Sequence, residues 1–409
     1  MRRIASDPGS FDLTIDKTVL PKDVELGARE FGTIWITTSR FDEPRDVAVY
    51  GGVITKIRRS SMRGYLQLSG SSFEWHLGTA RDRGPVMIGV ISLVGPPVVS
   101  VATALEWPLV PVVPAPYPPD FGRIQNSVPG MIMGANYQAL QTRADYLNII
   151  RNNHQDGGSN TNWLVNPRTR KVEFGTGGYL HPDKPVLHEA SLTDPYHPSA
   201  RISAPELLSD WEDFINQVIL TGENISAGTP PLEITQILPW PALLPFGSSP
   251  YRYPTGDDMF MALGEDHPHA SIIGLALLAY GLLDGGSASQ DTFTCTVEDF
   301  NPGGPLQAGC RARIWAPEAG LFNPNAPMEF AGQNIWPVEK TVQGIEWGVQ
   351  AGMGVYWQRG GAGSELIDLS DWVVPGDQGA RLIVGEWANK KNVPRRSMRM
   401  TRSARYALL

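Results

Sequence analysis

Apolar and polar residues alternate with a period of two along much of the first 94 residues. The runs "FDLTID", "GTIWITTSRF", "DVAVYGGVITKI" and "GYLQLSG" all follow this pattern. Because successive side chains of a strand point to opposite faces, such runs predict half-buried β-strands. The run "PVMIGVISLV" is apolar on both faces and predicts a central strand. Several short strands at this spacing predict a small barrel or sandwich, with Gly51 and Gly52 as a bulge or turn.

The period changes after a Pro-rich connector at 98–120. The stretch "GANYQALQTRADYLNIIRNNHQDGG" has apolar residues at helical spacing, and "DGG" ends it. One face of this predicted helix carries Tyr137, Leu140, Ala144, Leu147 and Ile150. The next stretch, "NTNWLVNPRTRKVEFGTGGYL", predicts a hairpin that turns at Asn166-Pro167. A second helix is predicted in "SAPELLSDWEDFINQVIL", with Ser203 as its N-cap.

Strand character returns in the last third of the chain. The run "ASIIGLALLAYGLL" is too short to span a bilayer and predicts a buried helix or strand pair. From "DTFTCTVED" to "ARLIVGEWAN" the pattern again favours strands. The sequence therefore predicts a mainly β fold with an inserted α+β domain. The expected parts are a β-rich domain with the connector, an α+β domain, a second β-rich domain and a basic tail, at 1–122, 123–230, 231–389 and 390–409.

Composition and charge narrow the class of protein. Gly (43) and Pro (35) make up nearly a fifth of the 409 residues without a fixed period, which excludes collagen and indicates many ordered turns. A net charge of −8 argues against general nucleic-acid binding. The tail "KKNVPRRSMRMTRSARYALL" is basic without a carboxylate, so it is either a solvated end or a docking arm for an acidic surface.

Targeting signals and cysteine usage point to a protein assembled in a reducing cytoplasm. The first residues lack the apolar core of a signal peptide. The longest apolar stretch, 84–119, is interrupted by prolines, which favours buried strands and a connector over a membrane-inserting loop. Cys295 and Cys310 lack metal-ligand spacing and are expected to be free and buried.

Two stretches contain residues that are able to carry chemistry. In "GEDHPHAS", Glu265, His267 and His269 would share a face of an extended segment, but two or three local ligands without a distant one rarely form a metal site. A loop-rich stretch offers a His–carboxylate pair to a hydrolase. Its candidates are His181, Asp183, His188, Glu189 and His197.

Neither stretch completes a catalytic constellation. The chain has no GxSxG nucleophile elbow, and "FGTGGYL" lacks the Lys and Ser or Thr of a phosphate-binding loop. Asp257 and Asp258 are adjacent, so in a strand they would face opposite ways and form a poor acid–base pair. We therefore expect no enzyme activity, no catalytic or metal site and no cofactor.

The region 51–81 contains three short stretches in a fixed order. "GGVITKI" is a predicted strand, "GYLQLSG" is a predicted strand that ends in Gly, and "SSFEWHLGTAR" is a short aromatic helix. This order resembles the N-terminal module of minor tail proteins of actinobacterial siphophages, with Gly52, Ile54, Gly70, Trp75, Leu77 and Arg81 at the matching positions. Within this motif, Trp75 is open to two interpretations, a residue of the domain core or an anchor at an interface.

A block near the C-terminus is similar to the late region of the same family. It runs from "IWAPEAGLFNPNAPMEF" through "GIEWGVQAGMGVYW" to "SELIDLSDWV", and "NTNWLVNPRTRKVEFG" looks like the family's middle hairpin. The three blocks follow the family's order. Two positions depart from it, because Asn323 stands where the family often has Asp and Gly348 where it has Pro.

The resemblance implies a structural function. Its relatives are similar to the central hub of phage baseplates, a ring, usually a trimer, in which each subunit gives two β-barrel-like modules. The implied partners are further copies of the chain, the distal-tail ring, the tape-measure protein, other tip proteins and the host surface. The implied location is the virion tail tip, after assembly in the host cytoplasm. Two alternatives stay open, a cell-wall hydrolase or peptidase and a carbohydrate-binding tip protein.

Overall fold

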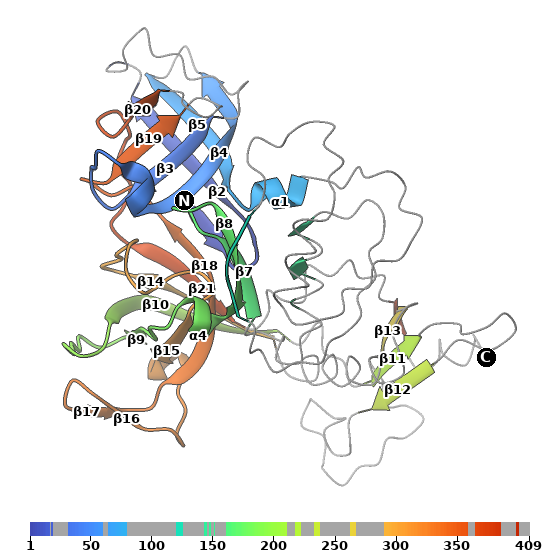
Figure 1. The fold of residues 1–409 in the computed structure, drawn as a ribbon. Helices are drawn as coiled ribbons and strands as arrows, with labels where there is room; N and C mark the ends of the chain where they lie inside the picture. Colours follow the sequence, from blue (N-terminus) through green and yellow to red (C-terminus); the bar gives the residue numbers. More distant parts are fainter. Residues whose placement is uncertain are drawn as a thin grey trace, which may run out of the picture.

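The structure, a computed structural model, describes residues 1–16, 18, 32–59, 64–79, 120–125, 143–144, 147–148, 151, 161–210, 217–221, 233–237, 262–266, 290–358, 365–385 and 398–400. Most of them lie in strands, so the predicted mainly β fold is confirmed (Figure 1). The described helical elements are short: α1 (Trp75–Thr79), α4 (Gly177–Leu180), and the 3-10 turns η2 (Pro44–Val47) and η3 (Pro317–Ala319).

Six strands form a closed barrel. In spatial order they are β15 (Arg311–Trp315), β9 (Val186–His188), β10 (Ser199–Asp210), β14 (Gln290–Val297), β21 (Ala380–Gly385) and β18 (Val338–Trp347). β18 also pairs with β15, which closes the ring. Closure leaves no free sheet edge around the ring, and free edges are the usual sites of unwanted pairing.

Six of the seven remaining strands of the same sheet form a barrel-like arrangement, which we call the second barrel. Their order is β2 (Asp7–Asp16), β5 (Tyr65–Ser72), β4 (Ala48–Arg59), β3 (Thr33–Thr37), β19 (Gly354–Gln358) and β20 (Leu366–Asp368). The chain that leaves β20 then returns to β2 through a bridge between Ile15 and Val373. Two backbone hydrogen bonds flank that bridge and bring the two sides of the second barrel together.

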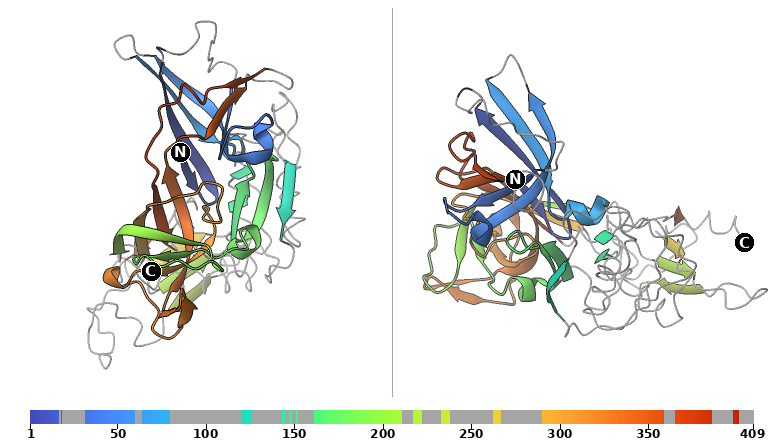
Figure 2. Two further views of the ribbon diagram at one scale, coloured as in Figure 1. Left: turned by 90° about the vertical axis from the view of Figure 1, so that its left-hand side faces the viewer. Right: turned by 45° about the horizontal axis from the view of Figure 1, so that its top comes forward.

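Strand β1 (Arg2–Ile4) joins the two barrels. It pairs antiparallel with β18 on one side, where Arg2 lies opposite Glu346, and with β2 on the other. The two barrels are therefore parts of one thirteen-stranded sheet. The views in Figure 2 show the N-terminal strand at the place where the barrels meet.

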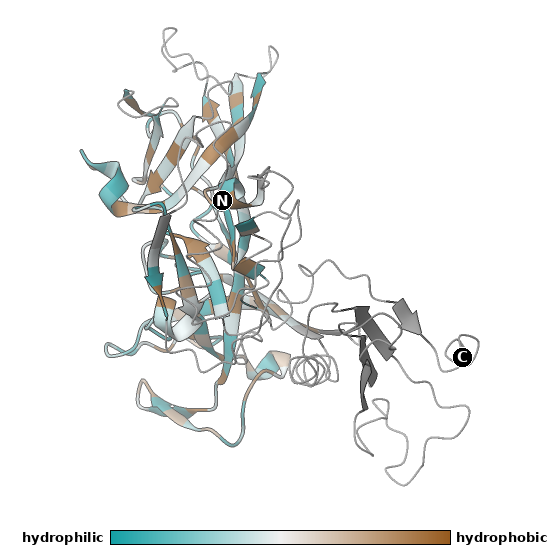
Figure 3. Ribbon diagram, turned by 45° about the vertical axis from the view of Figure 1, so that its right-hand side comes forward, coloured by the Kyte–Doolittle hydropathy of each residue, from teal (hydrophilic) through white to brown (hydrophobic). Residues whose placement is uncertain are grey.

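The alternating sequence pattern accounts for the barrel core. Along β2, the side chains of Phe11, Leu13 and Ile15 are buried, while the intervening residues are partly or fully exposed. Figure 3 shows the same alternation of hydrophobic and hydrophilic segments along the barrel strands. One cluster of buried apolar residues extends through both barrels, so burial of apolar area stabilises them together.

A three-stranded hairpin sheet packs beside the barrels. It consists of β6 (Asp120–Ile124), β8 (Lys171–Thr176) and β7 (Thr161–Val165), and β7 and β8 form the predicted hairpin. The described residues between 143 and 151 are helical, as predicted, and Ala144 and Leu147 are buried. The other three residues of the predicted helix face lie outside the described residues.

Two smaller sheets complete the described structure. β12 (Glu233–Ile237), β11 (Gln217–Thr221), β13 (Ala262–Asp266) and β22 (Met398–Met400) form one, and β16 (Met328–Phe330) and β17 (Gln333–Ile335) form the other. β22 belongs to the predicted basic tail, so this piece of the tail is a strand. The remaining tail, the apolar stretch 84–119 and the run 270–283 lie outside the described residues. A search of the described residues finds no helix able to cross a membrane.

The helix predicted over 203–220 is wrong. Residues up to Asp210 belong to β10, which pairs antiparallel with β14, and Gln217–Thr221 form β11. A left-handed Ala204 (φ 47°) lies in the bulge between Ser203 and Glu206. The local sequence favours a helix, but pairing with a strand some 90 residues later in the chain overrides that preference, as tertiary context often does.

Gly51 and Gly52 are also placed differently from the prediction. They continue β4 without a bulge, and the register shifts fall on either side of them, between Ala48 and Tyr50 in the pairing with β3 and between Ile54 and Lys56 in the pairing with β5. A Cβ on Gly51 would lie 2.2 Å from the Phe73 ring, and one on Gly52 would lie 2.5 Å from a strand carbonyl. These glycines are thus required by close packing against the strand.

Strand pairing crosses the boundaries that the sequence suggested. β9 and β10, from the segment 123–230, belong to the closed barrel, whose other strands come from 231–389. Likewise, β19 and β20 pair within the second barrel, whose other strands come from 1–122. Whether folding units follow the suggested boundaries stays a prediction.

Candidate functional site

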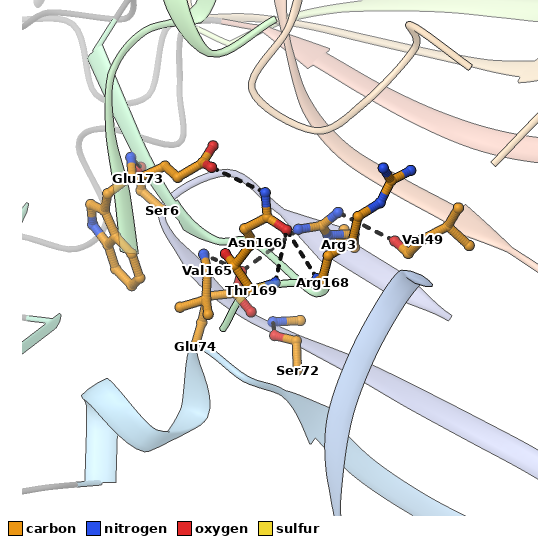
Figure 4. A network of polar contacts seen from close by, with 12 residues as sticks. Arg3, Ser6, Val49, Ser72, Glu74, Val165, Asn166, Arg168, Thr169 and Glu173 are labelled. Carbon is orange, nitrogen blue, oxygen red and sulfur yellow. Dashed lines mark hydrogen bonds and ion pairs between the residues drawn. The ribbon is translucent and has the colours of Figure 1, made fainter. Parts of the chain in front are cut away.

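The hairpin sheet meets the barrels at a polar junction, which we define by Ser6, Glu74, Trp163, Val165 and Arg3. The Trp163 N–H donates to Ser6 Oγ at 3.0 Å, and the Val165 N–H donates to Glu74 Oε1 at 3.0 Å (Figure 4). β7 pairs with β8 on its other side. Side chains from the barrel therefore take up the backbone donors that an edge strand would otherwise leave unpaired.

The acceptors of the junction are fixed by their own surroundings. Ser6 is buried in a left-handed conformation (φ 58°) and donates its hydroxyl to Asn162 Oδ1 at 3.3 Å. Glu74 is also buried, and its Oε1 lies 3.8 Å from Arg3 Nη2. Arg3 reaches back to the Val49 carbonyl at 3.5 Å. The junction thus ties β1, β4, α1 and the hairpin together.

Buried charges lie beside the junction. Burial raises the pKa of Asp7, and the nearby charges of Arg151 and Arg2 oppose that rise. Burial lowers the pKa of Arg151 to about 10, while Asp7 acts in the opposite direction. An uncompensated charge in such a place is strongly destabilising, and Asp7 and Arg151 compensate each other.

An aromatic contact lies next to the polar one. Phe73 packs edge-on against Trp35, with ring centroids 6.3 Å apart. The Arg170 guanidinium lies 4.8 Å from the Trp35 ring and 5.3 Å from the Phe73 ring, and Arg45 lies 5.1 Å from Trp35. Arg170 has a left-handed backbone (φ 60°). These cation–π contacts connect the hairpin turn to the outer face of the second barrel.

The motif that carries the family resemblance lies at this junction. Ile54 and Leu77 are buried, and a Cβ on Gly70 would lie 2.0 Å from the Val53 carbonyl oxygen. Trp75 is partly exposed, with its ring 5.4 Å from that of His76. Arg81 lies outside the described residues. Of the matching positions, Ile54 and Leu77 therefore contribute buried side chains, and Trp75 is partly exposed.

Two of the three histidines proposed for a hydrolase lie against one aromatic ring. His188 is buried on β9 and packs on Phe330, with ring centroids 5.6 Å apart, while His197 contacts the same ring at 6.4 Å. His197 Nδ1 lies 3.2 Å from Asp194 Oδ2. His181 follows α4 near the junction, and burial lowers its pKa to about 4. The expectation that these residues form no catalytic site stays a prediction.

The carboxylates and cysteines that the sequence analysis considered have these positions. Asp183 is exposed, and Glu189 Oε2 accepts the Glu318 N–H at 3.3 Å. Cys295 and Cys310 are free and buried as predicted, and burial raises the pKa of each thiol to about 12.

Of the residues considered for a metal site in "GEDHPHAS", the structure describes Glu265 but not the two histidines. In the part of the chain that the structure describes, no three His, Cys, Asp or Glu residues gather as a metal site. Glu265 lies in β13, whereas His267, His269, Asp257 and Asp258 lie outside the described residues.

The junction could hardly be predicted from the sequence. Ser6, Glu74 and Arg170 are ordinary surface types, and neither the left-handed backbone of Ser6 nor that of Arg170 is encoded by a glycine. The aromatic pair in "SSFEWHLG" was the one available signal, because apolar residues in a short amphipathic piece need a surface to cover.

No protein-family model matches the chain, and no curated protein matches it. Comparison with solved structures does find similar chains. The tail protein from Neisseria meningitidis MC58 is 13% identical, with 92% of this chain and 91% of that chain covered and a TM-score of 0.47. The prophage MuSo2 43 kDa tail protein from Shewanella oneidensis is 9% identical, with 94% and 92% covered and a TM-score of 0.49. The prophage tail protein gp18 from Listeria monocytogenes EGD-e is 8% identical, with 95% and 87% covered and a TM-score of 0.46. The structural neighbours are thus phage tail proteins.

Proposed function

We propose that this chain is a structural hub protein of the tail tip of a long-tailed phage. The observation that carries the proposal is the pair of barrels built from one continuous sheet. A subunit of a ring contacts two neighbours, so its two contact surfaces have to stand at a fixed angle to each other. Strand β1 pairs with β18 of the closed barrel on one edge and with β2 of the second barrel on the other, and it is therefore suited to hold the two barrels at a fixed angle.

The proposed assembly is a ring of three copies. Three chains with two barrels each would present six barrels, which suits a sixfold tail tube, as the sequence resemblance also implies. The ring would close the distal end of the tube in the virion and contact the distal-tail ring and the tape-measure protein. It would open on contact with the host cell. Its assembly in the host cytoplasm is part of the same proposal.

Electron microscopy of tails made without this gene product tests the function. We expect missing or open tips, because the proposed hub closes the distal end of the tube. Complementation with the wild-type chain should restore the tips. Intact tips in the absence of the protein would rule out a hub role. Native mass measurement of the purified chain tests the stoichiometry separately, and three copies are expected.

A further inference from the structure

The two ends of β4 carry surfaces of opposite charge. Before the strand, the loop 38–47, which we call the acidic loop, exposes the carboxylates of Asp42, Glu43 and Asp46. These three carboxylates outnumber the two arginines of the loop, of which Arg40 is paired with a carboxylate and Arg45 keeps its charge. Arg40 pairs with Asp371, and Arg45 donates to Gln358 Oε1 at 2.7 Å while it lies over Trp35. The outward charge of the acidic loop is therefore negative.

At the other end, Lys56, Arg58 and Arg59 of β4 and Tyr65 of β5 form what we call the basic arm. All four are exposed. Lys56 lies opposite Ser69, and Arg58 lies opposite Gln67, so uncharged partners flank the cations across the strand pair. Asp12 and Asp16 lie one strand further away, on β2. The outward charge along β4 is therefore positive.

Strand pairing along β4 changes after Ile54. β3 pairs with β4 from Ala48 to Val53. Among the described strands, β5 is the one that pairs with β4 beyond Ile54. Exposed cations along a strand discourage pairing with an arbitrary strand, and they favour a partner of matching charge.

Each end adds one exposed aromatic residue. Phe41 in the acidic loop is 39% exposed, and Tyr65 in the basic arm is 47% exposed. Specific interfaces commonly combine an aromatic anchor with a charged rim, where the anchor supplies most of the affinity and the rim selects the partner. Each end of β4 thus has the residue types that are typical of one side of a protein–protein interface.

The two ends cannot meet within one chain. Ala48 and Arg58 are the first and last of eleven consecutive residues in one strand. At the usual rise of a strand, the distance between them is about 30 Å. Figure 1 shows β4 extending between them. Their complementarity is therefore available only to different molecules.

We propose that the acidic loop of one subunit docks on the basic arm of a second copy of this chain. Such a contact is head-to-tail, because it joins two different surfaces, and repeated head-to-tail contacts close into a ring when the rotation between subunits allows it. The proposal rests on the ring proposed above and names the surfaces that would form it.

Charge reversal tests the contact. We compare the wild-type chain with an arm variant (Lys56→Glu and Arg58→Glu), a loop variant (Asp42→Lys and Glu43→Lys), and a combined variant with all four changes. Each reversed side places like charges together, so each single-sided variant should associate at least about tenfold more weakly than wild type. In the combined variant the charges again match, and association should return. Native mass spectrometry and sedimentation measure the assembly, and circular dichroism verifies folding.

A control variant reverses two exposed carboxylates away from β4, Glu329→Lys and Asp377→Lys, and should assemble as wild type does. If the single-sided variants also assemble normally, the contact is refuted while the ring stands. If both fail and the combined variant does not recover, the two surfaces do not face each other across the contact, and the proposed pairing of loop and arm is refuted. A wild-type chain that stays monomeric at every concentration overturns both the contact and the ring.

Discussion

Removal of the Glu74 carboxylate should release the hairpin sheet from the barrels. Glu74 accepts the Val165 N–H at 3.0 Å and lies 3.8 Å from the Arg3 guanidinium, and its side chain is buried. The substitution Glu74→Ala deletes the acceptor without adding bulk. It leaves a buried backbone donor on β7 and a buried cation on β1 without their shared partner.

The expected cost follows from these two contacts. A hydrogen bond to a charged group contributes about 1.5–3 kcal/mol, and the ion pair adds to this because Arg3 is largely buried. We therefore expect Glu74→Ala to destabilise the docked arrangement by about 3 kcal/mol, which raises the population of the undocked form more than about 100-fold. Glu74→Gln keeps an acceptor for Val165 but loses the charge, so its cost should be about half as large.

Urea unfolding and amide hydrogen exchange measure this effect. The exchange of the Val165 amide should accelerate strongly in Glu74→Ala and moderately in Glu74→Gln, while amides of the closed barrel, such as those of β21, keep their protection. The reasoning is refuted if Glu74→Ala lies within about 0.5 kcal/mol of wild type and the Val165 amide exchanges at the wild-type rate.

Three further results are expected. Gly51→Ala should lower the free energy of unfolding by about 1–3 kcal/mol in thermal or urea melts, because the added Cβ would lie 2.2 Å from the Phe73 ring; wild-type stability would contradict the close packing. His181 has a pKa lowered from 6.5 to about 4 by burial, so the unfolded chain takes up a proton first as the pH falls. Its stabilising contribution is complete above about pH 6.5 and is lost toward pH 4, and His181→Gln should remove this part of the pH dependence; an unchanged profile would refute it. Cys295 and Cys310 should react with a thiol reagent at pH 8 only as fast as the protein unfolds, because burial raises the pKa of each thiol to about 12; rapid labelling of folded protein would show that they are accessible.

Local pattern was enough to predict most of the individual strands. β2, β3, β5 and the β7–β8 hairpin lie where alternation or turn residues placed them, because each has one face in the core and the alternation records that face. The same reasoning failed at β10, whose Leu and Glu content favours a helix while a distant strand supplies its hydrogen bonds.

Partners could not be predicted from local pattern. Nothing near Ser6 or Glu74 in the sequence indicates that their oxygens accept N–H groups from β7, some 90 or more residues away. The same holds for the closed barrel, because its six strands come from four separate stretches of the chain. The period of apolar residues predicts which face of a strand is buried, but it does not predict which other residues pack on that face.

The position of β1 has a consequence for biosynthesis. Arg2–Ile4 pair with residues 344–346, so the seam between the barrels stays incomplete until the ribosome has added some 340 residues after them. At ordinary rates of translation this takes about 20–70 s. During that time the apolar face of β2 has no finished barrel to cover it, and we expect nascent chains to require a chaperone until the late strands emerge.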